Sequence, residues 1–323
     1  MPASHQPRFQ TQENPEAFFL VGPTAIGKTN VAQCIAESNG YYLLSADAML
    51  VYKCMDIGTA KPPESYRSEV TYWGVDVVEP DQSFNVGDYL RYVLEERQRL
   101  FYSGQRVVIV GGTGLYVKCL AQGLDPLPRS NEGLRNSYQN VLEKKGVVGI
   151  QQALRAISPE RLKAIEDPQN PRRLIRALEL ADQDVVSAEK KWDVTSTGTL
   201  MGLRMPSRWL YPVIEERIIS MYKQGLLDEV KALKNRYREL SETAVQAIGY
   251  KEALLVLANK CSLDEAKQQT IRRTKQLAKR QMTWFRNQMN VHWIEISPDM
   301  PVEIIAQEVM KGWEIYGPSS VVI

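Results

Sequence analysis

Two short apolar runs, each followed by a glycine-rich turn, dominate the first third of the sequence. The run at residues 17–21 (AFFLV) enters the turn at residues 22–29, and the run at residues 107–110 (VVIV) enters the turn at residues 111–114 (GGTG). Helical spacing of apolar residues follows both turns, and residues 41–45 form another strand-like run. Strands that alternate with helices predict a parallel α/β sheet, in which both turns lie at the edge where ligands bind.

From about residue 125 the strand pattern gives way to helical spacing with many polar residues. Breaks at residues 125–128 (DPLP) and 167–171 (DPQNP) enclose a stretch from about 130 to 165 that is predicted to be helical. Helical spacing returns at residues 172–181, 214–233 and 263–288. We therefore predict a disordered arm at residues 1–16, a core made of residues 17–125 and 198–323, and a helical insertion at residues 126–197.

Composition is that of an ordinary globular protein. Of the 323 residues, 44% are hydrophobic and 24% are charged, and the formal net charge of +2 gives no overall prediction of a polyanionic partner. The N-terminal arm lacks an apolar signal segment and no apolar run approaches membrane-spanning length, so we expect a cytoplasmic protein. The four cysteines are scattered without a CxxC pair, which argues against a zinc site or a disulfide framework. Nothing in the sequence predicts an oligomer, so a monomer is expected.

Residues 22–29 (GPTAIGKT) fit the phosphate-binding pattern G-x-x-x-x-G-K-[ST]. Glycines let the backbone wrap a phosphate with its N–H groups pointing inward, and the following helix adds its positive N-terminal end. Lys28 supplies a point charge and Thr29 offers a hydroxyl to Mg²⁺. The predicted fold is therefore a P-loop-type parallel sheet core flanked by helices, with a helical insertion domain. The candidate phosphate-binding residues are Gly22, Thr24, Ala25, Ile26, Gly27, Lys28 and Thr29.

The loop does not identify the phosphate compound that it binds. A P-loop NTPase would also need an acidic residue at the end of a core strand to hold Mg²⁺, whereas the strand at residues 107–110 ends in GGT. Asp47 follows the strand at residues 41–45, and by position it should lie near the phosphate loop, where a carboxylate can bind Mg²⁺ or act as a base. Capping of a following short helix is the alternative role for Asp47.

The chain also contains a series of longer blocks. They are DAMLVY at 47–52, MDIGTAKP at 55–62, GGTGLY at 111–116, DPQNPRR at 167–173, GLLDEV at 225–230, AIGYKE at 247–252 and AKRQMTWFR at 278–286. Together with the phosphate loop, and in this order, these blocks resemble the tRNA dimethylallyltransferase (isopentenyltransferase) family over about residues 17–290.

The resemblance implies that the loop holds the diphosphate of dimethylallyl diphosphate rather than ATP. The acceptor would be the exocyclic amine of the adenosine 3′-adjacent to the anticodon in tRNA, flipped out into the core, and the products would be isopentenyladenosine and diphosphate. By the same resemblance Asp47 is the general base, Thr113 contacts the tRNA and the leaving diphosphate, and Arg217 lies near the diphosphate. Mg²⁺ and the cationic side chains would neutralise the leaving group. The insertion would clamp the anticodon stem-loop.

Basic residues near the C-terminus, together with the resemblance, give candidate tRNA contacts. Residues 270–292 contain six Lys or Arg and no Asp or Glu. Four of these cations recur at helical spacing along one face, at Arg272, Lys275, Lys279 and Arg286. Trp284 and Phe285 would add stacking surface, and the alternative is a solvated helix face with Trp284 in the core. The full candidate set is Asp47, Ala48, Met49, Leu50, Thr113, Arg135, Arg172, Arg173, Arg176, Gly249, Tyr250, Lys279, Arg280, Gln281, Trp284 and Arg286.

An N-cap residue followed by proline predicts that a helix begins at residues 170–171, with three arginines in its opening turns. Cations at that end oppose the helix dipole, at a cost of about 0.3–1 kcal/mol each when exposed, and an anionic ligand would offset this cost. We therefore expect these arginines to contact RNA or diphosphate. A salt bridge from Arg176 to Glu179 or Glu166 is the alternative.

The chain departs from the family pattern at three places. Ala48 replaces a frequent serine, Val213 replaces a second arginine that often precedes Arg217 by four positions, and Thr274-Lys275 stands where Thr-Arg is common. The changes at Ala48 and Val213 concern substrate contacts rather than the reaction class. Three other functions stay open: a P-loop kinase or NTPase, a relative that prenylates free adenine nucleotides and would not need the basic C-terminal helix, and a catalytically inactive RNA-binding protein.

Overall fold

The structure, a computed structural model, describes residues 14–124, 128, 131–183 and 198–323. The chain divides into two compact units, one made of Met1–Leu124 with Trp192–Ile323 and the other of Asp125–Lys191. The arm predicted at residues 1–16 lies mostly outside the described residues, and its last residue, Glu16, already belongs to the first strand.

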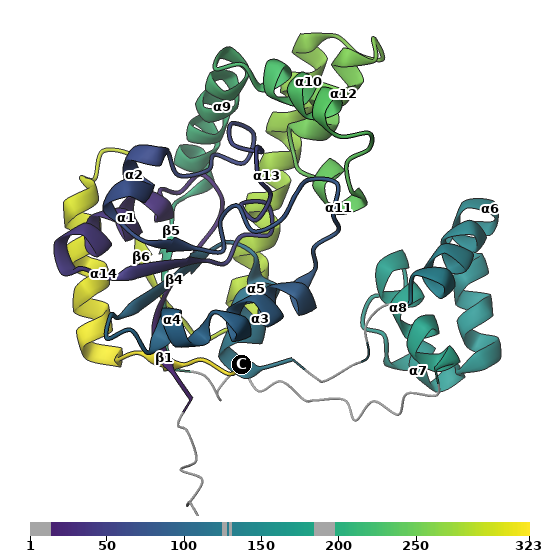
Figure 1. Cartoon of the computed structure of the whole chain (residues 1–323), viewed down its shortest axis with the longest axis horizontal. Coiled ribbons are helices and arrows are strands. Elements are labelled where there is room, and N and C mark those ends of the chain that lie inside the picture. Colours follow the sequence, from purple (N-terminus) through teal and green to yellow (C-terminus); the bar gives the residue numbers. More distant parts are fainter. Residues whose placement is uncertain (1–13, 125–127, 129–130, 184–197) are drawn as a thin grey trace, which may run out of the picture. The chain divides into compact units, whose positions relative to one another are not determined.

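The larger unit is built on a seven-stranded sheet in the order β3-β2-β4-β1-β5-β6, with β7 beside β1 (Figure 1). The strands are β1 (Glu16–Val21), β2 (Tyr42–Ser45), β3 (Tyr72–Trp73), β4 (Val107–Gly111), β5 (Leu200–Arg204), β6 (Val291–Glu295) and β7 (Ser319–Ser320). Every neighbouring pair from β3 to β6 is parallel, whereas β7 pairs antiparallel with Glu16 and Ala17. The predicted parallel α/β sheet is confirmed.

Helices lie on both faces of this sheet. The helices of this unit are α1 (Lys28–Asn39), α2 (Glu64–Glu69), α3 (Val86–Glu95), α4 (Arg97–Phe101), α5 (Gly114–Gln122), α9 (Ser207–Lys223), α10 (Leu226–Arg236), α11 (Glu242–Val245), α12 (Tyr250–Leu257), α13 (Leu263–Gln288) and α14 (Val302–Tyr316). Of these, α10 and α12 pack against each other and against α9 and α13. Among the described residues, none of the helices combines the length and the apolar character that a membrane crossing requires.

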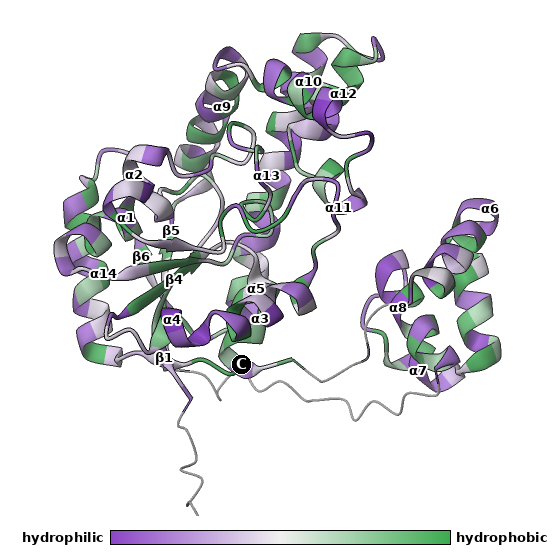
Figure 2. Ribbon diagram, viewed as in Figure 1, coloured by the Kyte–Doolittle hydropathy of each residue, from purple (hydrophilic) through white to green (hydrophobic). Residues whose placement is uncertain are grey.

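Alternating side chains of β1 face two different helical layers. Phe18 and Leu20 belong to the hydrophobic cluster that includes α1 and α14, whereas Phe19 and Val21 belong to the cluster with α3, α4 and α5. Figure 2 shows the hydrophobic residues gathered along the central strand β4. Burial on both faces explains why the central strands are continuous apolar runs rather than alternating ones.

The sequence analysis predicts no strand at β5 or β6, and it predicts one helix at residues 214–233. β5 escapes detection because Gly202 interrupts it, and an added Cβ there would lie 2.5 Å from Val291 Cγ1 of β6. The single helix is wrong, because α9 ends at Lys223 and α10 begins at Leu226 after Gly225, whose φ is +103°. The helix predicted at residues 263–288 is confirmed as α13.

The smaller unit contains three helices among its described residues, α6 (Glu132–Ile157), α7 (Pro159–Ala164) and α8 (Pro171–Asp182). α6 is kinked at Gly146, where φ is +66°. Leucine and isoleucine side chains of α6 and α8 form a separate small core. The predicted start of α8 is confirmed, because the Asn170 side chain accepts hydrogen bonds from the N–H groups of Arg172 and Arg173.

Candidate active site

The phosphate loop connects β1 to α1 at the carboxyl edge of the sheet. Its backbone is left-handed at Ala25, with φ +65°, and at Gly27, with φ +89°. An added Cβ at Gly22 would lie 2.6 Å from the carbonyl oxygen of Leu203 in β5, so only glycine fits this close approach. Left-handed residues in such a turn can direct backbone N–H groups toward an anion, and the N-terminus of α1 adds a positive end, so the loop is suited to anion binding.

Three charged groups influence one another beside this loop. The Lys28 ammonium donates a hydrogen bond to the Pro23 carbonyl over 2.6 Å. The residue as a whole is partly buried. Burial lowers the pKa of Lys28 to about 8, with the Asp47 carboxylate raising it and the Arg217 guanidinium lowering it. Burial also lowers the pKa of Arg217, while Asp47 raises it. The arrangement holds two cations in a poorly solvated place, which favours binding of an anion.

Asp47 and Thr113 lie on two segments that are hydrogen-bonded to each other. The Thr113 N–H donates to the Ala46 carbonyl over 3.1 Å, and the Thr113 hydroxyl oxygen accepts from the Ala48 N–H over 3.0 Å. Asp47 Oδ1 accepts from the Met49 N–H over 2.9 Å, so one carboxylate oxygen caps a turn, and Oδ2 accepts no hydrogen bond from the residues that the structure describes. Local capping and a catalytic role are therefore compatible.

A pocket of about 400 Å³ opens beside Arg217, between α9 and the segment that follows β2. It is lined by Asp56, Ile57, Ala60, Lys61, Arg217, Ser220, Met221 and Gln224. Lys61 is buried and pairs with the carboxylates of Asp56 and Asp76. These ion pairs hold in place the side of the pocket formed by residues 56–61, which we call the pocket wall.

Glu229 of α10 holds the pocket segment at residues 56–58 by hydrogen bonds. Its carboxylate accepts the N–H groups of Asp56 over 3.0 Å, Ile57 over 2.8 Å and Gly58 over 3.4 Å, and it also accepts the Tyr250 hydroxyl. The sequence analysis missed this role. A usable signal exists, because Glu229 falls three residues after buried Leu226 and therefore lies on the apolar stripe of its helix.

Replacing Glu229 with alanine should lower the free energy of unfolding by about 2–3 kcal/mol, because the carboxylate satisfies several partly buried donors at once. The matched control is Asp228→Ala, which removes an exposed carboxylate from the same turn of α10. Urea denaturation of both variants checks this expectation. Equal stability of the two variants would show that Glu229 does not hold the wall.

Gly249 and Tyr250 were predicted to contact tRNA, and the structure gives them another role. Tyr250 is fully buried with its hydroxyl on Glu229, and the Gly249 N–H donates to the buried carboxylate of Glu252 over 2.8 Å. Neither residue presents side-chain surface to a ligand. The block at residues 247–252 therefore contributes buried hydrogen bonds inside the protein rather than exposed side chains for tRNA.

One face of α13 packs against both glycine-rich turns. Gln281 Oε1 accepts the Thr24 N–H over 2.8 Å, and its Nε2 donates to the Gly112 carbonyl over 2.9 Å. Trp284 packs against the second turn so closely that an added Cβ on Gly114 would lie 2.2 Å from its ring. Phe285 is fully buried, so its predicted stacking surface is wrong, and Trp284 is only partly exposed.

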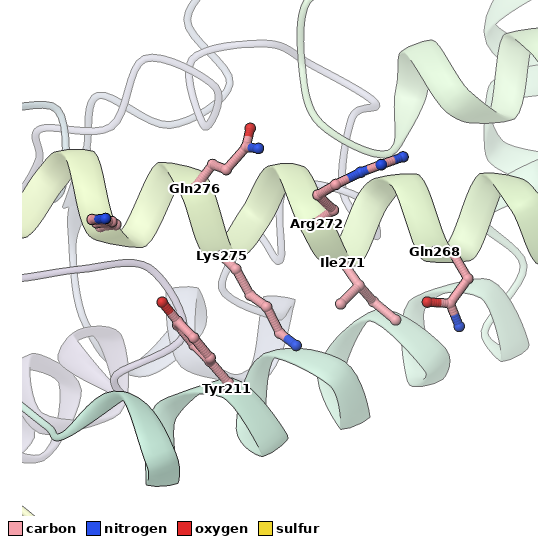
Figure 3. Close-up of a pocket in the computed structure, with 7 residues that line it drawn as sticks. Tyr211, Gln268, Ile271, Arg272, Lys275 and Gln276 are labelled. Atoms are coloured by element: carbon pink, nitrogen blue, oxygen red, sulfur yellow. The ribbon is translucent and has the colours of Figure 1, made fainter.

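The other face of α13 carries the predicted cations. A pocket of about 360 Å³ between α9 and α13 is lined by Tyr211, Gln268, Ile271, Arg272, Lys275, Gln276 and Lys279 (Figure 3). In this view Lys275 points toward α9, where it pairs with Glu215 and lies 5.1 Å from the centre of the Tyr211 ring. Arg272, Lys279, Arg280 and Arg286 are exposed. The shared face predicted for Arg272, Lys275 and Lys279 is confirmed.

Three arginines of the smaller unit form ion pairs inside that unit, namely Arg135, Arg173 and Arg176. Glu179 is fully buried, and its carboxylate accepts from Arg135 Nε over 3.0 Å and from Arg176 Nη1 over 3.0 Å. The ion-pair alternative therefore describes Arg176, because a buried carboxylate requires a cation. Arg173 pairs with Glu166 over 3.2 Å at the surface, and Arg172 is exposed.

The described residues contain no cluster of three or more His, Cys, Asp or Glu side chains that could hold a metal ion. Thr29 lies at the N-terminal end of α1, directly after the loop lysine. Mg²⁺ usually keeps several waters and takes one or two protein ligands together with phosphate oxygens. The Thr29 hydroxyl therefore fits a magnesium ion that binds together with a diphosphate. The described residues do not offer a metal site made of protein side chains alone.

Fold and site together define a parallel α/β protein with a glycine-rich loop beside two enclosed cations and a carboxylate. A family model described as IPP transferase matches residues 50–288. The chain therefore belongs to the IPP transferase family.

Known relatives match almost the whole chain. It is 36% identical to tRNA dimethylallyltransferase 2 of Syntrophus aciditrophicus, over 93% of this chain and 98% of that protein. It is 36% identical to tRNA dimethylallyltransferase of Bacillus subtilis, over 90% of this chain and 94% of that protein. A crystal structure of full-length tRNA isopentenylpyrophosphate transferase from Bacillus halodurans aligns with a TM-score of 0.66 and 32% identity, covering 93% and 97% of the two chains.

Proposed function

We propose that this chain transfers the dimethylallyl group of dimethylallyl diphosphate to the exocyclic amine of the adenosine 3′-adjacent to the anticodon in tRNA. The products are isopentenyladenosine and diphosphate. The observation that carries the proposal is that hydrogen bonds join the Asp47 segment to the second glycine-rich turn, and that turn through Gln281 to the loop that precedes Lys28. The electrostatic influence of Asp47 on Lys28 and Arg217 agrees with this arrangement. Membership of the IPP transferase family, with tRNA dimethylallyltransferases as relatives along the chain, supports it.

The diphosphate binds through the N–H groups of the loop and the two cations. In this proposal the adenosine amine attacks C1 of the dimethylallyl group, and the bond from C1 to the diphosphate oxygen breaks. Lys28 and Arg217 stabilise the negative charge that develops on the leaving oxygen, and this preorganised electrostatic contribution is the main source of catalysis. Thr29 would help to hold Mg²⁺ next to the bound diphosphate, and the ion would supply further neutralising charge.

Asp47 accepts the proton that the amine loses when it becomes alkylated. Its free oxygen lies in the segment of residues 47–50, which together with Thr113 forms the proposed contact surface for the flipped adenine. Extrusion of the base is needed because chemistry on a buried amine cannot take place inside a stacked loop. Asp47, Ala48, Met49, Leu50 and Thr113 are the residues assigned to this surface.

The tRNA backbone is assigned to the exposed cations of α13 and of the smaller unit. Charge complementarity supports contacts from Arg272, Lys279, Arg280 and Arg286, with Trp284 adding apolar surface. Arg172 and Arg173 are the exposed candidates on the smaller unit, which we propose as the clamp on the anticodon stem-loop. All four cysteines are free thiols, which is consistent with the proposed location in the cytoplasm, and we propose that the protein acts as a monomer.

Label transfer tests the proposed function directly. Purified protein is incubated with Mg²⁺, labelled dimethylallyl diphosphate and unmodified tRNA that has adenosine 3′ of the anticodon, with AMP and ATP as parallel acceptors. Label in the tRNA alone is the expected result, and its loss when that adenosine is replaced by guanosine locates the acceptor. Label in AMP, or hydrolysis of ATP without transfer, would contradict the proposal in favour of a nucleotide prenyltransferase or an NTPase.

A further inference from the structure

Gln281 uses both ends of one side-chain amide to join two loops that are far apart in sequence. Its oxygen accepts the Thr24 N–H of the phosphate loop over 2.8 Å, across 257 residues. Its nitrogen donates to the Gly112 carbonyl of the second turn over 2.9 Å, across 169 residues. The bridge lies where the neighbouring parallel strands β1 and β4 end.

The amide of Gln281 lies directly against the backbone of the second turn. An added Cβ at Gly112 would lie 2.4 Å from Gln281 Nε2, so the amide is in close contact with the backbone of the turn. Three residues along α13, Trp284 is in the same close contact with Gly114. One face of a single helix is therefore fitted against the second glycine-rich turn at two successive points.

Each turn holds a different reacting group in place. Thr24 belongs to the loop assigned to the diphosphate. Gly112 directly precedes Thr113, whose hydroxyl oxygen accepts the N–H of Ala48, next to Asp47. A continuous path of hydrogen bonds thus runs from the phosphate loop, through Gln281 and the second turn, to the segment that carries the base.

We propose that Gln281 is a positioning residue that sets the spacing between the diphosphate and Asp47 during transfer. The inference rests on the proposed function. An amide is suited to this task because it both accepts and donates, whereas a carboxylate only accepts and a thioether does neither with comparable strength. Because misplacement of reactants by about 1 Å can cost about 10²-fold in rate, a residue that touches neither reactant can still control turnover.

The competing assignment is that Gln281 contacts RNA directly. Both polar atoms of its side chain are already engaged with backbone groups, and helical spacing places it on the face of α13 opposite to Arg272, Lys279 and Arg286. The two roles predict different kinetics. A positioning residue affects kcat at saturating substrates, whereas an RNA contact affects the Kd for tRNA.

The test compares Gln281→Met and Gln281→Glu with the control Gln269→Met, which changes the same residue type on α13 away from the site. We expect Gln281→Met to lower kcat by about 30–100-fold while the Kd for tRNA and the melting temperature stay near those of the control. In Gln281→Glu the carboxylate keeps the acceptor and loses the donor. Its activity relative to Gln281→Met should therefore rise as pH falls, because a protonated carboxyl can donate to the Gly112 carbonyl again.

The outcomes separate this inference from the proposed function. Absence of transfer by the wild-type protein contradicts the proposed function itself. Wild-type transfer with Gln281→Met within threefold of Gln269→Met overturns the positioning role. A weakened Kd for tRNA with unchanged kcat at saturating tRNA also overturns it, in favour of RNA contact. A fall in melting temperature that accounts for the lost activity would make Gln281 a purely structural residue.

Discussion

Asp47→Asn should lower kcat by about 10²–10⁴-fold, the usual contribution of a positioned general base. Asparagine keeps the side-chain shape and can still accept the Met49 N–H through its amide oxygen, so the turn at residues 48–51 should be preserved. The amide cannot take the proton of the adenosine amine. Single-turnover transfer at saturating dimethylallyl diphosphate and tRNA measures this effect without a contribution from substrate binding.

The control for Asp47 is Asp81→Asn, an exposed carboxylate outside the site. We expect the Kd for tRNA of Asp47→Asn to stay within about threefold of wild type, because the substitution removes one charge and keeps the side-chain volume. Turnover close to that of Asp81→Asn would contradict the role of Asp47 as base. Lost turnover together with lost tRNA binding would instead make Asp47 a binding residue.

Lys28→Met should weaken binding of dimethylallyl diphosphate by about 10²–10³-fold and at the same time stabilise the ligand-free protein. Burial holds the pKa of Lys28 at about 8, so below pH 8 the folded protein carries a charge in an unfavourable place. Methionine removes that charge and keeps the length of the side chain. We expect the free energy of unfolding at pH 7 to rise by about 1–3 kcal/mol. Lys260→Met, on an exposed residue, is the control.

The lowered pKa of Lys28 also predicts how protein stability and diphosphate affinity depend on pH. Between about pH 8 and 10.5 the unfolded chain holds more protons on this lysine than the folded protein, so the contribution of Lys28 to stability rises with pH there, and Lys28→Met lacks that contribution. Bound diphosphate favours the charged ammonium, so its affinity for wild type should fall as pH increases above 8. Calorimetric titration from pH 7 to 9.5 measures this dependence. A pH-independent affinity in wild type would contradict the assignment of Lys28 to the diphosphate.

The parts of the site that the sequence predicts are those encoded by neighbouring residues. The phosphate loop and the second glycine-rich turn each combine an apolar strand, a turn and a helix within a short segment, and both appear as predicted. The N-cap at Asn170 is likewise a local pattern. Periodicity and turn chemistry are sufficient for such features because the interactions that form them are close in sequence.

The parts that were missed depend on partners far away in the chain. The motif at residues 247–252 identified Tyr250 without indicating that Glu229 would bury its hydroxyl. The basic pattern around Arg176 likewise could not show that Glu179 is buried beneath it. Gln281 has no local signal for its bridge, since both of its partners are backbone groups more than a hundred residues away. A residue's type and spacing do not report on such tertiary contacts.

The pairing of β1 has a consequence for how fast the chain folds. This central strand pairs with β4 and β5, and its first residues pair with β7 at the end of the chain. The Trp313 indole also donates to the Phe19 carbonyl over 3.4 Å. Every partner of β1 lies 90 residues or more away in sequence, as the pairs Phe18–Val108, Leu20–Met201 and Glu16–Ser320 show, so the sheet has a high contact order and its consolidation should be slow.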